Sequence, residues 1–132
     1  MALLEVPPGL YRGTVEGEES GHCVCRMEVR RLTEHALSLD YEAVGDDGLQ
    51  HVEHTIITAS SLHVAMGEFS EVVAFHEGLA GVFTAAVAAP MPMQIRADFA
   101  DATLTWVWHW APPGEPLREQ SRATAWIGRA RT

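Results

Sequence analysis

The chain has 132 residues, of which 47% are hydrophobic and 20% charged, with a formal net charge of −9 at pH 7. This length and apolar content predict one globular domain over residues 1–132 and exclude a disordered chain. The negative charge disfavours nucleic acid and anionic membranes as partners, because both are bound through clustered Lys and Arg, and no apolar run reaches the roughly 18 to 20 residues of a membrane-spanning helix.

The N-terminal third is predicted to form three strands. The first residues carry Glu5 and two prolines where a secretory signal would be apolar, which predicts a cytoplasmic protein. Residues 10–17 follow as a strand. Residues 22–30 and 37–43 alternate apolar and polar side chains, as half-buried strands do.

Two cysteines lie on the second of these strands. Cys23 and Cys25 are two positions apart, so their side chains point to one face at a separation of about 6.5 to 7 Å. A disulfide needs a Cβ separation of roughly 3.8 Å. We interpret both residues as small apolar side chains that face a core, and we predict no metal site, because a second cysteine pair is missing.

The next run, residues 49–58, is rich in strand-forming residues, but its two faces are less distinct. On a strand His51 and Glu53 share one face, and His54 shares the other with two β-branched neighbours. The apolar neighbours favour an inward position for His54, either as a hydrogen-bonded core group or as a ligand contact. We therefore expect His54 to supply a polar group inside the fold.

A short strand is predicted around Leu62, Val64 and Met66, and the stretch that follows it is ambiguous. Residues 70–89 fit either two strands joined near Gly78 or one amphipathic helix. A glycine inside a helix costs about 1 kcal/mol relative to alanine, and this stretch has two, Gly78 and Gly81. The glycines favour two strands.

The C-terminal third contains three more predicted strands, over residues 91–99, 104–110 and 118–128. Trp106, Trp108 and Trp110 share one face of the middle strand. A tryptophan has a large apolar body and one N–H group, so this stripe fits a packed core, the wall of a ligand pocket or a dimer interface.

Nine or ten short strands separated by turns every 8 to 12 residues predict an all-β fold, an antiparallel up-and-down β-barrel of about 8–10 strands. The chain resembles the calycins, the superfamily of lipocalins and fatty-acid-binding proteins. In that family a Gly-x-Trp motif opens the first strand, and an arginine from the last strand covers the ring. Gly9, Leu10 and Tyr11 occupy the place of that motif, and the candidates for the covering arginine are Arg118, Arg122 and Arg129. The resemblance implies that the barrel binds a small apolar ligand.

We therefore predict a binding protein that encloses an apolar or aromatic small molecule, with no catalytic residue, metal ligand or cofactor assigned. Strand parity places these residues in the cavity wall: Tyr41, His54, Met66, Phe83, Trp106 and Trp108. Two alternatives remain open. One is a homodimeric interaction module without a cavity, and the other is an enzyme that uses a histidine such as His54 or His76 as a general base.

Overall fold

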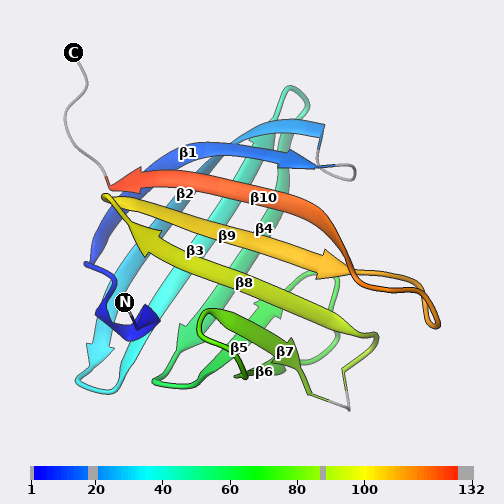
Figure 1. The fold of residues 1–132 in the computed structure, drawn as a ribbon. Coiled ribbons are helices and arrows are strands. Elements are labelled where there is room, and N and C mark those ends of the chain that lie inside the picture. Colours follow the sequence, from blue (N-terminus) through cyan, green and yellow to red (C-terminus); the bar gives the residue numbers. More distant parts are fainter. Residues whose placement is uncertain (1, 18–20, 87–88, 128–132) are drawn as a thin grey trace.

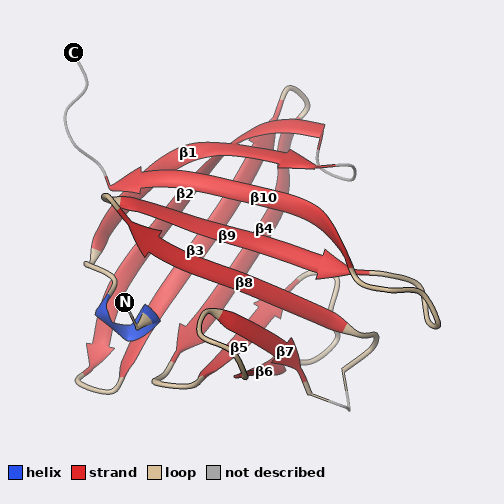
Figure 2. Cartoon of the chain, in the orientation of Figure 1, coloured by secondary structure: helices blue, strands red, loops and turns tan. Residues whose placement is uncertain are grey.

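The protein is a closed barrel of ten antiparallel strands in the computed structural model, which describes residues 2–17, 21–86 and 89–127 (Figures 1 and 2). Each strand pairs with its neighbours in the chain, and β1 closes the barrel against β10. This confirms the predicted all-β up-and-down barrel. The elements are η1 (Leu3–Glu5), β1 (Gly9–Gly17), β2 (Gly21–Thr33), β3 (Ala36–Gly45), β4 (Gly48–Ile57), β5 (Ser61–Met66), β6 (Val73–Glu77), β7 (Val82–Ala85), β8 (Met93–Ala100), β9 (Thr103–Trp110) and β10 (Arg118–Ile127).

The ambiguous stretch at residues 70–89 forms two short strands, β6 and β7, as the glycines favoured; residues 87–88 lie outside the described residues. The turn between the strands depends on Gly81, whose φ of +78° places it in the left-handed region. A Cβ at this position would lie 2.7 Å from the carbonyl oxygen of Ala97. The backbone N–H of Gly81 donates to the Glu77 carboxylate at 2.8 Å within the turn, and the Gly81 carbonyl oxygen accepts from the backbone N–H of Ala97 on β8 at 2.9 Å.

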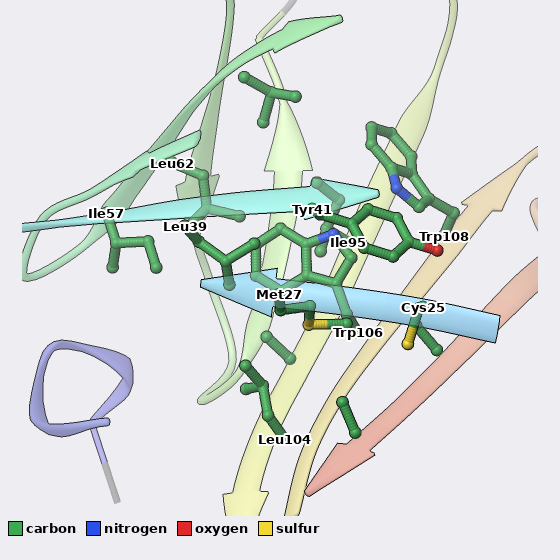
Figure 3. Close-up of a cluster of buried hydrophobic side chains, with 14 of the residues drawn as sticks. Cys25, Met27, Leu39, Tyr41, Ile57, Leu62, Ile95, Leu104, Trp106 and Trp108 are labelled. Atoms are coloured by element: carbon green, nitrogen blue, oxygen red, sulfur yellow. The ribbon is translucent and has the colours of Figure 1, made fainter. Parts of the chain in front are cut away.

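Apolar residues fill the middle of the barrel and the end that lies beside η1. Figure 3 shows side chains from several strands meeting there, among them Met27, Leu39, Ile95 and Leu104. At the η1 end the N-terminal arm is tied down, since the Arg31 guanidinium donates to the Leu4 carbonyl oxygen at 2.9 Å. Alternation of apolar and polar residues along the strands therefore builds a core that closes one end of the barrel.

The residues that carry the calycin resemblance lie at the closure between β1 and β10. Tyr11 is buried, its hydroxyl donates to the Pro7 carbonyl oxygen at 2.7 Å, and its ring packs edge-on against Phe99. Neither predicted arginine on β10 covers this ring: Arg118 is exposed and paired in register with Trp110, and Arg122 forms an ion pair with Glu119. Arg129, the third candidate, lies outside the described residues.

The orientation predicted for β4 was wrong. His54 lies on the outer face, where its Nδ1 atom is 2.9 Å from the Asp40 carboxylate, while Glu53 is fully buried inside. The reason is a β-bulge next to the β3–β4 turn: Ala43 pairs with His51 but Val44 pairs with Leu49, so β4 contains one extra residue. A regular hairpin would have placed the face of His54 inside, and the extra residue exchanges the two faces.

Among the described residues, no helix has the length and apolar character needed to cross a lipid bilayer.

Candidate ligand-binding cavity

A cavity of about 470 Å³ lies at the end of the barrel opposite η1. Its walls come from the ends of the strands and from the segments beside them. Four aromatic side chains line it: Tyr41 from β3, Phe69 from the segment after β5, and Trp108 and Trp110 from β9. The size and apolar lining fit a single small organic molecule.

Sulfur-containing and polar side chains complete the wall. The sulfur atoms come from Cys23, Met66, Met91 and Met93, and the polar groups come from His51, Glu68 and Ser121. Methionine adapts its shape readily, and its thioether packs well against aromatic rings. A wall of this kind adjusts to the outline of a ligand.

Trp108 is the centre of an aromatic cluster beside the cavity. Its ring meets Phe75 at 5.7 Å, Trp110 at 6.1 Å and Phe69 at 6.4 Å between ring centroids, each edge-to-face. Edge-to-face contacts between aromatic rings each stabilise by about 0.5 to 1.5 kcal/mol beyond the burial of their surface. The cluster therefore holds the indole of Trp108 in one orientation.

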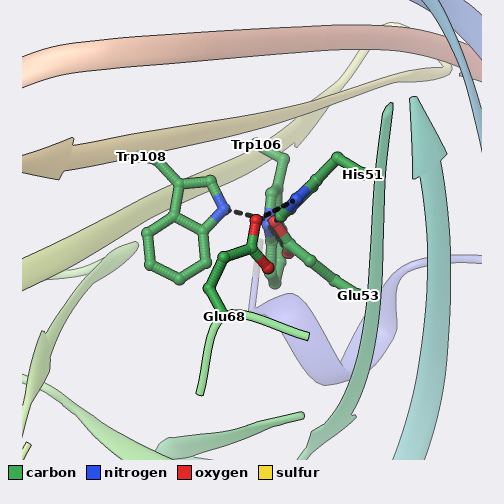
Figure 4. A network of polar contacts seen from close by, with 5 residues as sticks. All are labelled: His51, Glu53, Glu68, Trp106 and Trp108. Atoms are coloured by element: carbon green, nitrogen blue, oxygen red, sulfur yellow. Dashed lines mark hydrogen bonds and ion pairs between the residues drawn. The ribbon is translucent and has the colours of Figure 1, made fainter. Parts of the chain in front are cut away.

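A buried carboxylate holds the two indoles from the opposite side of the barrel (Figure 4). Glu53 on β4 is fully buried and accepts a hydrogen bond from Trp106 Nε1 at 3.1 Å and another from Trp108 Nε1 at 2.6 Å. His51 Nε2 lies 2.6 Å from the same oxygen as Trp108. An ionised carboxylate is an acceptor only, so it satisfies all of these donors at once.

His51 lies between two carboxylates. Its Nε2 atom contacts Glu53 and its Nδ1 atom lies 3.1 Å from the Glu68 carboxylate. Burial alone would lower the pKa of His51, but the hydrogen bonds and negative charges of Glu53 and Glu68 outweigh it and raise the pKa above its ordinary value. The protonated imidazole donates from both nitrogens and balances one of the two negative charges.

Tyr41 faces the same network from β3, where it is the direct cross-strand partner of Glu53. Its ring packs edge-on against His51 at 5.8 Å. Burial, followed by the negative charge of Glu53, raises the pKa of Tyr41 well above its ordinary value, so the phenol remains protonated. Its hydroxyl has no hydrogen-bond partner among the described residues and is available to a ligand.

The structure brings together only part of the predicted wall. Tyr41, Met66 and Trp108 line the cavity. Trp106 lies beneath it, fully buried and bonded to Glu53, and Phe83 is in the packed core beside Ile95. His54 is outside the barrel, as described above. Whether the lining residues bind a ligand remains a prediction.

Sequence reasoning missed the polar part of the site. The sequence places His51 and Glu53 on one face of β4, but the inward position expected for His54 favours the opposite face. Glu68 and Phe69 belong to an irregular segment, to which strand parity does not apply. The signal that identifies Glu53 is the tryptophan strand itself, since two inward indole N–H groups require a buried acceptor.

The other histidines offer less for acid–base chemistry. His54 is paired with Asp40, and His76 is exposed on β6. Within the part of the chain that the structure describes, no three His, Cys, Asp or Glu side chains gather in a way that would hold a metal ion. The cavity wall presents ring faces, thioethers and a few polar groups.

The fold is similar to that of two solved structures. The crystal structure of Rv2717c from M. tuberculosis matches over 96% of this chain and 95% of that chain, with a TM-score of 0.70 and 14% sequence identity. A redesigned β-barrel, mFAP1, bound to DFHBI, matches over 96% of this chain and 99% of that chain, with a TM-score of 0.53 and 12% identity. No protein-family model and no curated protein matches the chain. The comparisons support a small ten-stranded barrel and do not extend to the calycin family specifically.

Proposed function

We propose that the protein binds a small organic molecule, apolar or aromatic in its larger part, in the cavity at the open end of the barrel. The observation that carries this proposal is the division of the interior: apolar side chains pack the η1 end, and a cavity of about 470 Å³ remains at the other. A concave, largely apolar space of this size with a few polar groups in its wall is typical of a site for a small organic molecule.

The rigidity of the wall supports the same proposal. The indole of Trp108 is held by the Glu53 carboxylate and by three neighbouring rings. The end of β9 is held as well, because the Gln120 side chain donates to the Trp110 carbonyl oxygen at 3.0 Å. A wall fixed before binding loses little conformational entropy when a ligand enters.

The structure of mFAP1 bound to DFHBI adds support from outside this chain. In that structure a barrel of similar fold is bound to a small compound. At 12% identity the likeness concerns the fold, so the chemistry of the ligand must be argued from the residues of this chain.

Native mass spectrometry of freshly purified protein, followed by titration with aromatic compounds under tryptophan fluorescence, tests the proposal. We expect a bound small molecule or a saturable change in the emission of Trp108 and Trp110. Two variants serve as a matched pair. Trp110→Ala removes a ring from the cavity wall, and Trp126→Ala removes one from the outer face of β10, where this side chain is 47% exposed.

Binding should weaken by about tenfold or more in Trp110→Ala and remain unchanged in Trp126→Ala. Equal weakening in both variants would place the bound compound outside the cavity. If no compound saturates the protein and none is found after purification, the binding function is wrong.

A further inference from the structure

Acidic side chains outnumber basic ones around the cavity among the described residues. Glu68 lies in the wall and Glu53 lies directly behind it, and His51 is the single cationic side chain between them. Among the described residues that line the cavity, none is arginine, and the sequence contains no lysine. With His51 protonated, these three groups sum to one negative charge.

The strongest hydrogen-bond donors near the cavity are already in use. Both nitrogens of His51 contact carboxylates, and the N–H of Trp108 is bonded to Glu53. A ligand with a carboxylate or phosphate group would therefore find two carboxylates nearby and neutral side-chain donors alone, the hydroxyls of Tyr41 and Ser121 and the indole N–H of Trp110. Burying an anion against like charges without an unused cationic donor is costly.

A cationic ligand group would instead find favourable partners in this cavity. Aromatic rings from Tyr41, Phe69, Trp108 and Trp110 line the cavity, and a cation within about 6 Å of such a ring face is attracted by the negative face of the π-system. The Glu68 carboxylate uses Oε2 for His51, and its Oε1 atom has no hydrogen-bond partner among the residues described. Rings and a carboxylate with an unused oxygen together form a site for a positively charged group.

We propose that the cavity selects an organic cation, an apolar or aromatic molecule that carries a protonated amine or a quaternary ammonium group. This inference rests on the proposed function and specifies the charge of the ligand. The apolar part of the molecule occupies the space among the methionines and rings, and the cationic group lies near Glu68 and the aromatic faces.

Three probes of similar size and different charge test the proposal. Phenyltrimethylammonium is a cation, tert-butylbenzene is its neutral isostere with carbon in place of nitrogen, and benzenesulfonate is an anion. Affinities are measured by calorimetry and tryptophan fluorescence at an ionic strength of about 0.15 M, which screens charges more than about 8 Å away and so reduces the effect of the overall negative charge. We expect the cation to bind about tenfold more tightly than the neutral isostere, and the anion to bind most weakly.

Two glutamates of the same segment provide the matched variants. Glu68→Gln removes the carboxylate at the cavity, and Glu71→Gln removes an exposed carboxylate that does not line it. The affinity for phenyltrimethylammonium should fall by about fivefold in Glu68→Gln and stay unchanged in Glu71→Gln. The affinity for tert-butylbenzene should be the same in the wild type and in both variants.

The outcomes separate the two proposals. If tert-butylbenzene binds as tightly as phenyltrimethylammonium, charge selection is wrong while the cavity remains a binding site. The same conclusion follows if Glu68→Gln and Glu71→Gln weaken cation binding equally. If none of the three probes binds at concentrations up to the solubility of each, charge selection is overturned, and the binding function is decided separately by the native mass spectrometry and titration described above.

Discussion

Trp108 and Glu53 are 55 residues apart in the chain and are joined inside the barrel by a hydrogen bond of 2.6 Å between indole Nε1 and carboxylate Oε2. Their strands, β9 and β4, are not neighbours in the sheet, so the bond crosses the interior. The same carboxylate accepts from Trp106 and contacts His51. One buried group therefore connects the packed half of the barrel to the wall of the cavity.

Replacing this carboxylate by an amide should be costly. In Glu53→Gln the amide NH₂ group would face the N–H donors of Trp106 or Trp108, and His51 would lose the buried one of its two carboxylate partners. Breaking a buried charged pair typically costs about 3 to 5 kcal/mol. We expect a loss of that order in the free energy of unfolding, measured by urea denaturation.

A partly exposed acidic residue on the outer face of the neighbouring strand is the control for this measurement. Asp40 pairs with Arg30 and His54 on the outside of the barrel. Asp40→Asn should cost less than about 1 kcal/mol, because solvent screens exposed pairs. A cost for Glu53→Gln no larger than that of Asp40→Asn would contradict the role assigned to Glu53.

The N–H group of Trp106 can be removed while most of its ring is kept. Trp106→Phe leaves Oε1 of Glu53 without its indole donor, and an unsatisfied buried acceptor costs about 1 to 3 kcal/mol in addition to the lost packing. Trp126→Phe makes the same change on the outer face and should leave the melting temperature almost unchanged. Similar melting temperatures for the two variants would show that the indole bond contributes little.

The pKa values of two histidines are shifted in opposite directions. The carboxylates of Glu53 and Glu68 raise the pKa of His51 despite its burial, and the neighbouring Tyr41 stays neutral. For His109, burial followed by the charge of Arg96 lowers the pKa. Two-dimensional NMR of the imidazole nitrogens should therefore find His51 protonated above pH 6.5 and His109 neutral below it; the reverse order would contradict both assignments.

The raised pKa of His51 also determines whether its contribution to the unfolding free energy grows or falls as the pH rises. Its stabilising contribution is complete below about pH 6.5, the ordinary histidine value, and is lost as the pH rises through the higher folded-state value. The difference in unfolding free energy between the wild type and His51→Gln should shrink as the pH is raised from 6 to 9. A difference that grows over this range would exclude a protonated His51 in the folded protein.

Closure of the barrel depends on the absence of a side chain at residue 13. A Cβ at Gly13 would overlap the Thr124 carbonyl oxygen and lie 2.6 Å from the Cα of Ala125, across the pairing of β1 with β10. Gly13→Ala should lower the unfolding free energy by about 3 kcal/mol or more, because backbone must shift to make room. Gly67→Ala, where an added Cβ meets nothing within 4 Å, is the control and should change stability by less than about 1 kcal/mol.

The sequence predicted the barrel well because the patterns that identify its strands are local in the chain. Alternation along β2 and β3 and the glycines near residue 80 identify strands without knowledge of their partners. The inner face of β4 depends instead on one extra residue beside a turn, which alternation does not reveal. The network around Glu53 depends on two strands that meet only across the closed barrel, and Glu68 enters the cavity wall from an irregular segment.

The bulge in β4 shows that a change of one residue in the length of this strand can exchange its inward and outward faces, which no point substitution does. With the residue at position 51 deleted and the bulge kept, the register from Val52 onward would move by one, so that Val52, His54 and Ile56 would replace His51, Glu53 and Thr55 as the residues turned inward. The imidazole in the cavity wall and the carboxylate behind it would both be exchanged in one step, and Glu68 would remain as a charged side chain of the wall. A barrel of this type can therefore change the charge of its interior through the deletion of a single codon within β4, and homologues that differ in length between this bulge and Glu53 are expected to differ in the kind of ligand they accept.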